Sequence, residues 1–230
     1  MVNEKTIVDK YDKSNMQDLP RVLFPGRIEV IVNERDAVRA VKFLMKQTLL
    51  GFDTETRPSF SKGKMNKVSL LQVCCLTSAP KSSAKEEGDI CFLFRLTRID
   101  LPECLIKLLE DKTITKVGLA LRDDLRALEQ RKPFKSGTFI DLQDTAKQMG
   151  IADGSLQKLY ANIFGQRISK GQQLSNWEAD TLSEAQKLYA ATDAWACVML
   201  YREMMRMQKE GFELEVRDEN ASKPPSDPSL

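Results

Sequence analysis

Histidine is absent from this chain of 230 residues. Its absence excludes Ser-His-Asp and Cys-His nucleophile systems, histidine-ligated zinc sites and any histidine general base. An enzyme with this sequence therefore has to use carboxylates, tyrosine, lysine or a bound metal ion for its chemistry.

Cysteine is scarce, and its pattern excludes two further uses. The five cysteines form no C-x-x-C pair, and they fall in apolar segments. An odd number of cysteines without metal-ligand spacing is typical of reduced residues in the core of a cytosolic protein, so we expect a cytoplasmic location. The cysteines are Cys74, Cys75, Cys91, Cys104 and Cys197.

Long hydrophobic runs and a strong net charge are missing as well. No apolar run approaches the length of a membrane span, and the N-terminal residues contain no apolar core of a signal peptide. We therefore expect no membrane association, and no feature indicates an obligate protein partner. The net charge is +2, so any contact with nucleic acid has to come from a local basic patch.

The order of the apolar patterns predicts an α/β protein. Short apolar runs indicate strands, and apolar residues at helical spacing indicate helices between them. The early strands follow one another and the later ones alternate with helices, which is typical of a mixed sheet covered by helices. We expect strands at 27–33, 48–56, 67–76, 89–96, 113–120 and 138–142, and helices at 34–47, 101–111, 122–131, 143–150, 155–165 and 183–209.

The ends of the chain differ in composition from its middle. Residues 1–24 are polar and closed by prolines, so we expect an irregular N-terminal arm. Residues 25–212 are expected to form one domain. Residues 213–230 are polar and proline-rich, which predicts a disordered C-terminal tail.

Two acidic residues lie at the end of the apolar strand predicted at 48–56. Asp53 and Glu55 are two positions apart, so both side chains face the same side of a sheet. Carboxylates in this arrangement can share a divalent cation. Acidic pairs at this spacing also occur elsewhere in the chain, so the alternative is a pair of strand-end carboxylates that cap the next turn.

A second acidic pair follows the strand predicted at 113–120. Asp123 and Asp124 stand where a helix begins, and Asp is a preferred N-cap that suits the helix dipole. One of the two can be that cap. The other would then point along the carboxyl edge of the sheet, where open α/β sheets place their sites.

A third candidate lies in the middle of the last predicted helix. The capping box formed by Ser183 and Gln186 starts this helix, and Tyr189 and Asp193 share one of its faces because they are four residues apart. An isolated carboxylate among apolar residues costs several kcal/mol. The alternative is a structural Tyr–Asp hydrogen bond, but it leaves the rest of an ionised carboxylate unsatisfied.

Taken together, these acids predict a metal site made of oxygen ligands. Asp53, Glu55, Asp124 and Asp193 come from three separated segments, and in one cleft they would repel one another without cations. Hard divalent cations such as Mg²⁺ or Mn²⁺ prefer carboxylates and water. Two such ions about 4 Å apart stabilise the attacking and leaving oxygens of phosphoryl transfer, and this chemistry needs no histidine.

At these residues the sequence resembles the DEDD superfamily of 3′–5′ exonucleases, in the ribonuclease D and Werner-type branch. "FDTET" is similar to the first motif of the family, "RDDLRAL" to the second, and "KLYAATDAW" to the third motif in its tyrosine form. The segment 154–195 resembles the Werner-type exonuclease domain throughout, including "SNW" (175–177). The resemblance covers about residues 28–208 and favours Asp124 over Asp123 in the second motif.

The resemblance implies a ribonuclease H-like fold and a two-metal mechanism that releases nucleoside 5′-monophosphates from a nucleic-acid 3′ end. It implies that Asp53, Glu55 and Asp193 hold one ion. The second ion would be held mainly by Asp53, with Asp124 acting largely through water. Tyr189 would orient the attacking water.

Residues near these motifs are candidates for substrate binding. The polar loop at 56–67 is rich in basic residues, which would contact phosphates, and Met65 is expected to stack on the terminal base. The alternative is a solvated loop with incidental lysines. Gln72 lies in an apolar strand and is expected to brace the site, because a buried amide needs partners. The substrate-binding candidates are Thr56, Arg57, Lys64, Met65, Lys67 and Lys170.

Two other functions compete with an exonuclease. One is a non-catalytic nucleic-acid-binding module of the same fold, which is disfavoured because all four acids and the tyrosine are present. The other is a metal-dependent phosphodiesterase that acts on small nucleotides. The sequence does not distinguish DNA from RNA, because that choice depends on contacts to the 2′-hydroxyl.

Overall fold

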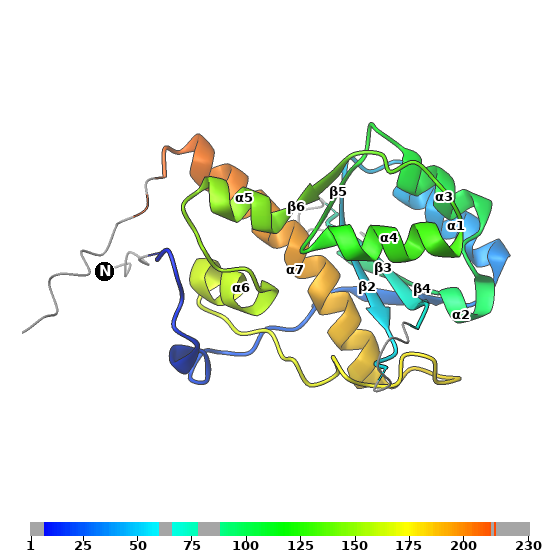
Figure 1. The fold of residues 1–230 in the computed structure, drawn as a ribbon, viewed down its shortest axis with the longest axis horizontal. Coiled ribbons are helices and arrows are strands. Elements are labelled where there is room, and N and C mark those ends of the chain that lie inside the picture. The colour runs from blue at the N-terminus through cyan, green and yellow to red at the C-terminus, as the bar shows by residue number, and fades with distance from the viewer. Residues whose placement is uncertain (1–6, 60–65, 78–87, 213, 215–230) are drawn as a thin grey trace, which may run out of the picture.

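A mixed six-stranded sheet forms the centre of the described part of the protein. The computed structural model describes residues 7–59, 66–77, 88–212 and 214. In these residues the strand order is β1-β4-β3-β2-β5-β6 (Figure 1). Strands β2, β3 and β4 form an antiparallel meander, β5 and β6 run parallel to β2, and β1 runs parallel to β4. The strands are β1 (Arg27–Ile31), β2 (Leu49–Thr56), β3 (Val68–Cys75), β4 (Ile90–Arg95), β5 (Thr115–Gly118) and β6 (Phe139–Asp141). The predicted mixed sheet is confirmed.

Helices cover both faces of this sheet and create two separate apolar cores. One core joins α1, α3 and α4 to one face, and the other joins α5, α6 and α7 to the opposite face. The short helix α2, which the sequence did not predict, follows β4 directly. The helices are α1 (Glu34–Leu44), α2 (Leu96–Ile99), α3 (Glu103–Glu110), α4 (Leu121–Arg131), α5 (Leu142–Gln148), α6 (Leu156–Phe164) and α7 (Glu184–Lys209). Among the described residues, no helix has the length and hydropathy that a membrane span requires.

The strand β2 divides its side chains between these two cores. Leu50 and Phe52 point into the core under α1, α3 and α4. Gly51, one position out of phase, faces α7, and a Cβ atom at Gly51 would lie 2.0 Å from the carbonyl oxygen of Ala194. Only a residue without a side chain permits this approach. The absence of a side chain at Gly51 thus brings α7 directly against β2, two residues before Asp53 of the predicted acidic pair.

The helix α7 is a long scaffold whose start is fixed by its sequence. The predicted capping box is present, because the Ser183 side chain accepts from the Gln186 backbone N–H and the Gln186 side chain accepts from the Ser183 N–H. Residues 189–198 of this helix are all buried. Small residues among them, such as Ala190 and Ala194, are fully enclosed and let the helix approach the sheet closely.

The N-terminal residues 7–24 lie against α6 and α7. The backbone of Val8 exchanges two hydrogen bonds with the Asn162 side chain on α6, and the Phe24 N–H donates to the Thr192 hydroxyl on α7 at 3.0 Å. This segment is irregular except for the 3-10 helix η1 (Lys13–Met16), as the sequence indicates. Apart from Leu214, the predicted C-terminal tail lies outside the described residues.

Candidate active site

Three carboxylates from β2 and α7 come together on one face of the sheet. Asp53 and Glu55 follow Gly51 on the side of β2 that faces α7, and Asp193 projects from the buried face of α7. One carboxylate oxygen of each residue lies within 4.8 Å of the corresponding oxygens of the other two. The strand and the helix that were predicted to supply these acids therefore meet at this point.

Burial raises the pKa values of these acids, and neighbouring carboxylates raise those of Asp53 and Glu55 further. Burial raises the pKa of Asp53 well above its ordinary value, and the charges of Asp193, Glu55 and Asp124 raise it further. Burial and the charges of Asp193 and Asp124 raise the pKa of Glu55 to about 9. Burial raises the pKa of Asp193 to about 7, although Tyr189 and Lys170 oppose the rise. The full negative charge of this cluster is therefore costly in the absence of a cation.

Tyr189 lies one helical turn before Asp193, close enough that each residue shifts the pKa of the other. Burial and the negative charges of Asp193 and Glu55 raise the pKa of the Tyr189 hydroxyl above its ordinary value, so it stays protonated and can donate. Its ring packs against Trp177, with ring centroids 6.1 Å apart. Trp177 is fully buried, so it packs in the core and is not exposed to stack on a base.

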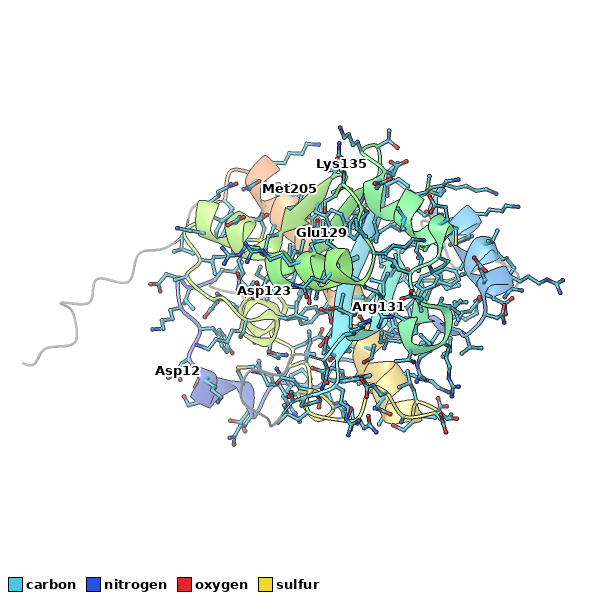
Figure 2. The ribbon with its side chains drawn as sticks, turned by 45° about the vertical axis from the view of Figure 1, so that its right-hand side comes forward. Asp12, Asp123, Glu129, Arg131, Lys135 and Met205 are labelled. Atoms are coloured by element: carbon cyan, nitrogen blue, oxygen red, sulfur yellow. The ribbon has the colours of Figure 1, made fainter. Side chains whose placement is uncertain are left out.

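The structure places Asp124, and not Asp123, beside this cluster. The Thr54 hydroxyl donates to Asp124 at 2.6 Å, and the charge of Asp124 contributes to the raised pKa values of Asp53 and Glu55. Burial raises the pKa of Asp124 itself to about 6. The side chain of Asp123 is 87% exposed, and its carboxylate lies 4.0 Å from Arg126 (Figure 2).

The position of Asp124 follows from where strand pairing ends. The strand β5 pairs with β2 only as far as Gly51, so Asp53 to Thr56 have no paired strand on that edge of the sheet. Helix α4 begins three residues after β5 ends, and its first turn carries Asp124. Thr54 alternates with Asp53 and Glu55 along β2, so it meets Asp124 from the opposite face of the strand.

The prediction that Asp123 or Asp124 caps α4 is wrong. The N-cap position is Ala120, in the left-handed conformation with φ 58, and its side chain provides no cap. The backbone N–H groups of Ala120 and Leu121 instead donate to the two carboxylate oxygens of Asp141, at 3.1 and 2.8 Å. Asp141 is the last residue of β6 and lies beside the end of β5, the strand that precedes α4. An acidic residue at the end of the neighbouring parallel strand is therefore the sequence signal that could have indicated this cap.

The predicted substrate-binding residues occupy different positions around the acids. Lys170 is exposed, and it lies close enough to Asp193 to lower the pKa of that carboxyl. Arg57 is exposed and forms an ion pair with Glu178 at 3.1 Å. Thr56 is half-buried at the end of β2, and Lys67 is exposed just before β3. Lys64 and Met65 lie outside the described residues.

Gln72 is the direct cross-strand neighbour of Asp53. Its side chain is 0% exposed, and among the described residues neither amide atom has a hydrogen-bond partner. Directly opposite residues of an antiparallel pair point to the same face, so Gln72 lies on the face of the acids. It adjoins the site as expected, but no hydrogen bond links it to a carboxylate.

The donor set of this cluster fits a divalent cation. All of its potential ligand atoms are carboxylate oxygens, and they converge from the strand β2 and the helix α7. One carboxylate oxygen of Asp193 is buried and has no hydrogen-bond donor among the described residues. Hard cations bind such oxygen-only sites, and a positive charge would stabilise the ionised form of each acid. The fold and the site together define an α/β protein of the ribonuclease H-like class with a cluster of carboxylates that could hold a metal ion.

Comparisons with known proteins identify the family. The model of the 3′–5′ exonuclease family matches residues 28–209, so the chain belongs to this family. The mouse (Mus musculus) bifunctional 3′-5′ exonuclease/ATP-dependent helicase WRN is 31% identical over 202 residues. That match covers 84% of this chain but only 14% of the mouse protein.

Solved structures of related proteins share the fold. The EXO domain of Aedes aegypti Nibbler has a TM-score of 0.69 at 18% identity, and the match covers 84% of this chain and 93% of that domain. RNase D of Escherichia coli has a TM-score of 0.66 at 20% identity, and the match covers 80% of this chain and 46% of RNase D. At these identities the likeness shows the fold alone.

Proposed function

We propose that this protein is a 3′–5′ exonuclease that hydrolyses nucleic acid from its 3′ end to nucleoside 5′-monophosphates with two divalent cations, Mg²⁺ or Mn²⁺. The observation that carries this proposal is the convergence of Asp53, Glu55 and Asp193 within 4.8 Å, in a chain of the 3′–5′ exonuclease family. The presence of all four predicted acids and of Tyr189 favours an active enzyme over a non-catalytic binding module of the same fold.

We infer the division of the ligands between two ions from the resemblance to the exonuclease family. Asp53, Glu55 and Asp193 would hold one ion, and the second would be held mainly by Asp53, with Asp124 acting largely through water. When bound, two divalent cations stabilise negative charge on the attacking and leaving oxygens of a phosphodiester. Thr54 fixes Asp124 through its short hydrogen bond, which keeps this carboxylate turned toward β2.

Tyr189 would position the attacking water. Its hydroxyl is held protonated by the surrounding negative charge, and its ring is fixed against Trp177. A rigid hydroxyl beside the carboxylates can orient a water molecule through a hydrogen bond, and correct orientation is a large part of the catalysis of such reactions. This assignment places the protein in the tyrosine form of the superfamily.

Basic residues around the cluster would hold the substrate. Lys170 stands next to Asp193 and would contact a phosphate of the terminal nucleotides. Thr56, Arg57 and Lys67 lie at the exit of β2 and the entry of β3, where further phosphate or sugar contacts would form.

The proposal is tested with matched oligonucleotides of DNA and RNA, single- and double-stranded, labelled at the 5′ end and incubated with Mg²⁺ or Mn²⁺. We expect a ladder that shortens one nucleotide at a time from the 3′ end and stops when the metal is chelated. Asp193→Asn should give no ladder. Cleavage at internal positions, or hydrolysis of mononucleotide esters without any shortening of strands, would overturn the proposed function.

A further inference from the structure

A groove lies between the N-terminal segment and the chain that follows α6. We define the arm as residues 7–24 and the facing segment as residues 166–171. Figure 1 shows the arm, in blue, running past the segment that leaves α6. The groove has a volume of about 420 Å³, with Lys13 and Met16 on the arm side and Arg167, Ile168 and Lys170 on the facing side.

This groove adjoins a cavity that reaches Tyr189. A smaller cavity of about 50 Å³ shares Ile168 and Ser169 with the groove, and its lining reaches Arg21 of the arm and Tyr189 of α7. Lys170, at the end of the groove, acts electrostatically on Asp193. A ligand in the groove would therefore be directed toward the atoms that we assign to catalysis.

Backbone hydrogen bonds fix the arm in this position. The Arg167 N–H donates to the Pro20 carbonyl at 2.9 Å, and the Val22 N–H donates to the Arg167 carbonyl at 3.0 Å. The Arg167 side chain donates to the Leu19 carbonyl at 2.9 Å. Because main-chain atoms make most of these bonds, the side chains of Lys13 and Arg21 are not needed to hold the arm, and both are exposed.

The groove and the cavity are basic. Lys13, Arg21, Arg167 and Lys170 line them, and no acidic residue does. Within the described part of the chain, none of these four forms an ion pair with a carboxylate. The carboxylate of Asp12 accepts from the Ser14 N–H at the start of η1 and does not line the groove (Figure 2).

We propose that the arm and the facing segment form a binding site for the sugar-phosphate backbone of a single strand, upstream of the 3′-terminal nucleotide. The inference rests on the proposed function for the direction of the strand. A polyanion matches a group of cations that form no ion pair among the described residues, and these cations would offset the repulsion between the approaching phosphates and the acids of the site. The half-buried side chain of Met16 offers an apolar surface for sugars or bases between the phosphate contacts.

The test compares two variants that lose the same charge. The first is Lys13→Ala combined with Arg21→Ala. The control is Arg35→Ala combined with Lys42→Ala, both exposed on α1 at the opposite face of the sheet. Binding of a fluorescent single-stranded 12-mer and of a dinucleotide is measured by anisotropy, with chelator present so that no cleavage occurs, over a range of salt concentrations.

We expect the first variant to bind the long strand about tenfold more weakly, with a salt slope reduced by about 1.4 for two lost phosphate contacts. The control variant should bind like the wild type. The loss should be smaller for the dinucleotide, which is too short to fill the groove. A circular dichroism melt like that of the wild type verifies that the first variant is folded.

Two results separate this proposal from the proposed function. If the first variant has the affinity and the salt slope of the control for the long strand, the groove assignment is wrong, whatever the wild type does to a 3′ end. If the wild type shortens no strand and the first variant still loses affinity, the exonuclease assignment fails while the groove stands as a single-strand site.

Discussion

Buried charged side chains lie on both faces of the sheet. The two sets differ in whether the protein provides hydrogen-bond partners for them. On the face under α3, Lys116 of β5 is 1% exposed, and its ammonium group donates to the carbonyls of Leu108 and Asp111 and lies 4.8 Å from the centre of the Phe139 ring. On the face under α7, burial raises the pKa values of the acids of β2 and α7, the charge of Asp193 raises those of Asp53 and Glu55 further, and a buried oxygen of Asp193 has no donor among the described residues.

This difference distinguishes a structural charge from a functional one. A buried cation whose hydrogen bonds all end on backbone carbonyls has its partners within the fold, and its removal harms only stability. A cluster of buried anions without a cation is destabilising by itself, and natural proteins keep such clusters where a ligand completes them. The two faces therefore predict opposite responses to substitution.

The largest effect is expected for Asp53→Asn. We predict that exonuclease activity falls by at least about 10³-fold, which corresponds to ~4 kcal/mol of lost transition-state stabilisation. In the absence of metal the melting temperature should rise, because the change removes a negative charge that three neighbouring acids repel. Activity assays and thermal melts in chelator test both parts.

The control for this prediction is Asp123→Asn, in the exposed acid of the second motif. It should keep the activity and the melting temperature of the wild type. If Asp123→Asn is inactive and Asp124→Asn is active, the assignment of Asp124 to the site is wrong.

The opposite response is expected for Lys116→Met, which keeps the length of the side chain but not its donors. The carbonyls of Leu108 and Asp111 lose their bonds to the ammonium group, so the free energy of unfolding should fall by about 2–4 kcal/mol. Urea unfolding measures this loss, and the specific activity of the folded protein should be unchanged. Lys107→Met, at an exposed position of α3, serves as the control. Equal stability of the two variants would contradict the structural role of Lys116.

The dependence of stability on pH sharpens the comparison further. An acid whose pKa is higher in the folded state than in the unfolded state stabilises the folded protein at pH values below its unfolded-state pKa. This stabilisation is lost as the pH rises through the folded-state pKa. Asp124 has a pKa of about 6, Asp193 of about 7 and Glu55 of about 9. We therefore expect the melting temperature of the metal-free protein to fall by more than about 4 °C between pH 5 and 8.

Saturating Mn²⁺ should remove this fall, because a bound cation stabilises the ionised carboxylates. The measurement is a set of thermal melts across this pH range with chelator and with Mn²⁺. A metal-free protein that becomes more stable as pH rises would show that the pKa values of these acids are not raised in the folded state.

The smallest effect is expected for Gln72→Leu. Because both amide atoms of Gln72 are buried without partners among the described residues, an apolar side chain of similar size should raise stability by about 1 kcal/mol. Gln186→Leu is the matched comparison, since the side chain of Gln186 bonds Ser175, Asn176 and Ser183. It should lower stability by about 1 kcal/mol. Denaturant unfolding ranks the two, and a loss at Gln72 would show that its amide is bonded.

Local patterns in the sequence predicted the parts of the site that depend on one element at a time. The spacing of two places Asp53 and Glu55 on one face of a strand, and the spacing of four places Tyr189 and Asp193 on one face of a helix. The capping box at Ser183 also depends on neighbouring residues only. These features follow from the geometry of the elements, whatever the rest of the fold.

The parts that the sequence did not predict depend on contacts between distant segments. The choice of Asp124 over Asp123 was supported by family resemblance, but its structural basis is the contact of Asp124 with Thr54 of β2, a distant segment, while Asp123 points to solvent. The cap that Asp141 provides for α4 requires the neighbouring ends of β5 and β6. The docking of the arm joins Val8 to Asn162, 154 positions away. No local pattern contains this information.

The central claim is that the acids of β2 and α7 form a cation site, and calorimetric titration of Mn²⁺ into the metal-free protein tests it most directly. We expect saturable binding that releases protons, seen as heats that change with the ionisation enthalpy of the buffer, because carboxyls with raised pKa values must ionise to bind the metal. Binding should be lost in Asp193→Asn and kept in Asp123→Asn. Equal binding by both variants, or no binding by the wild type, would contradict the claim.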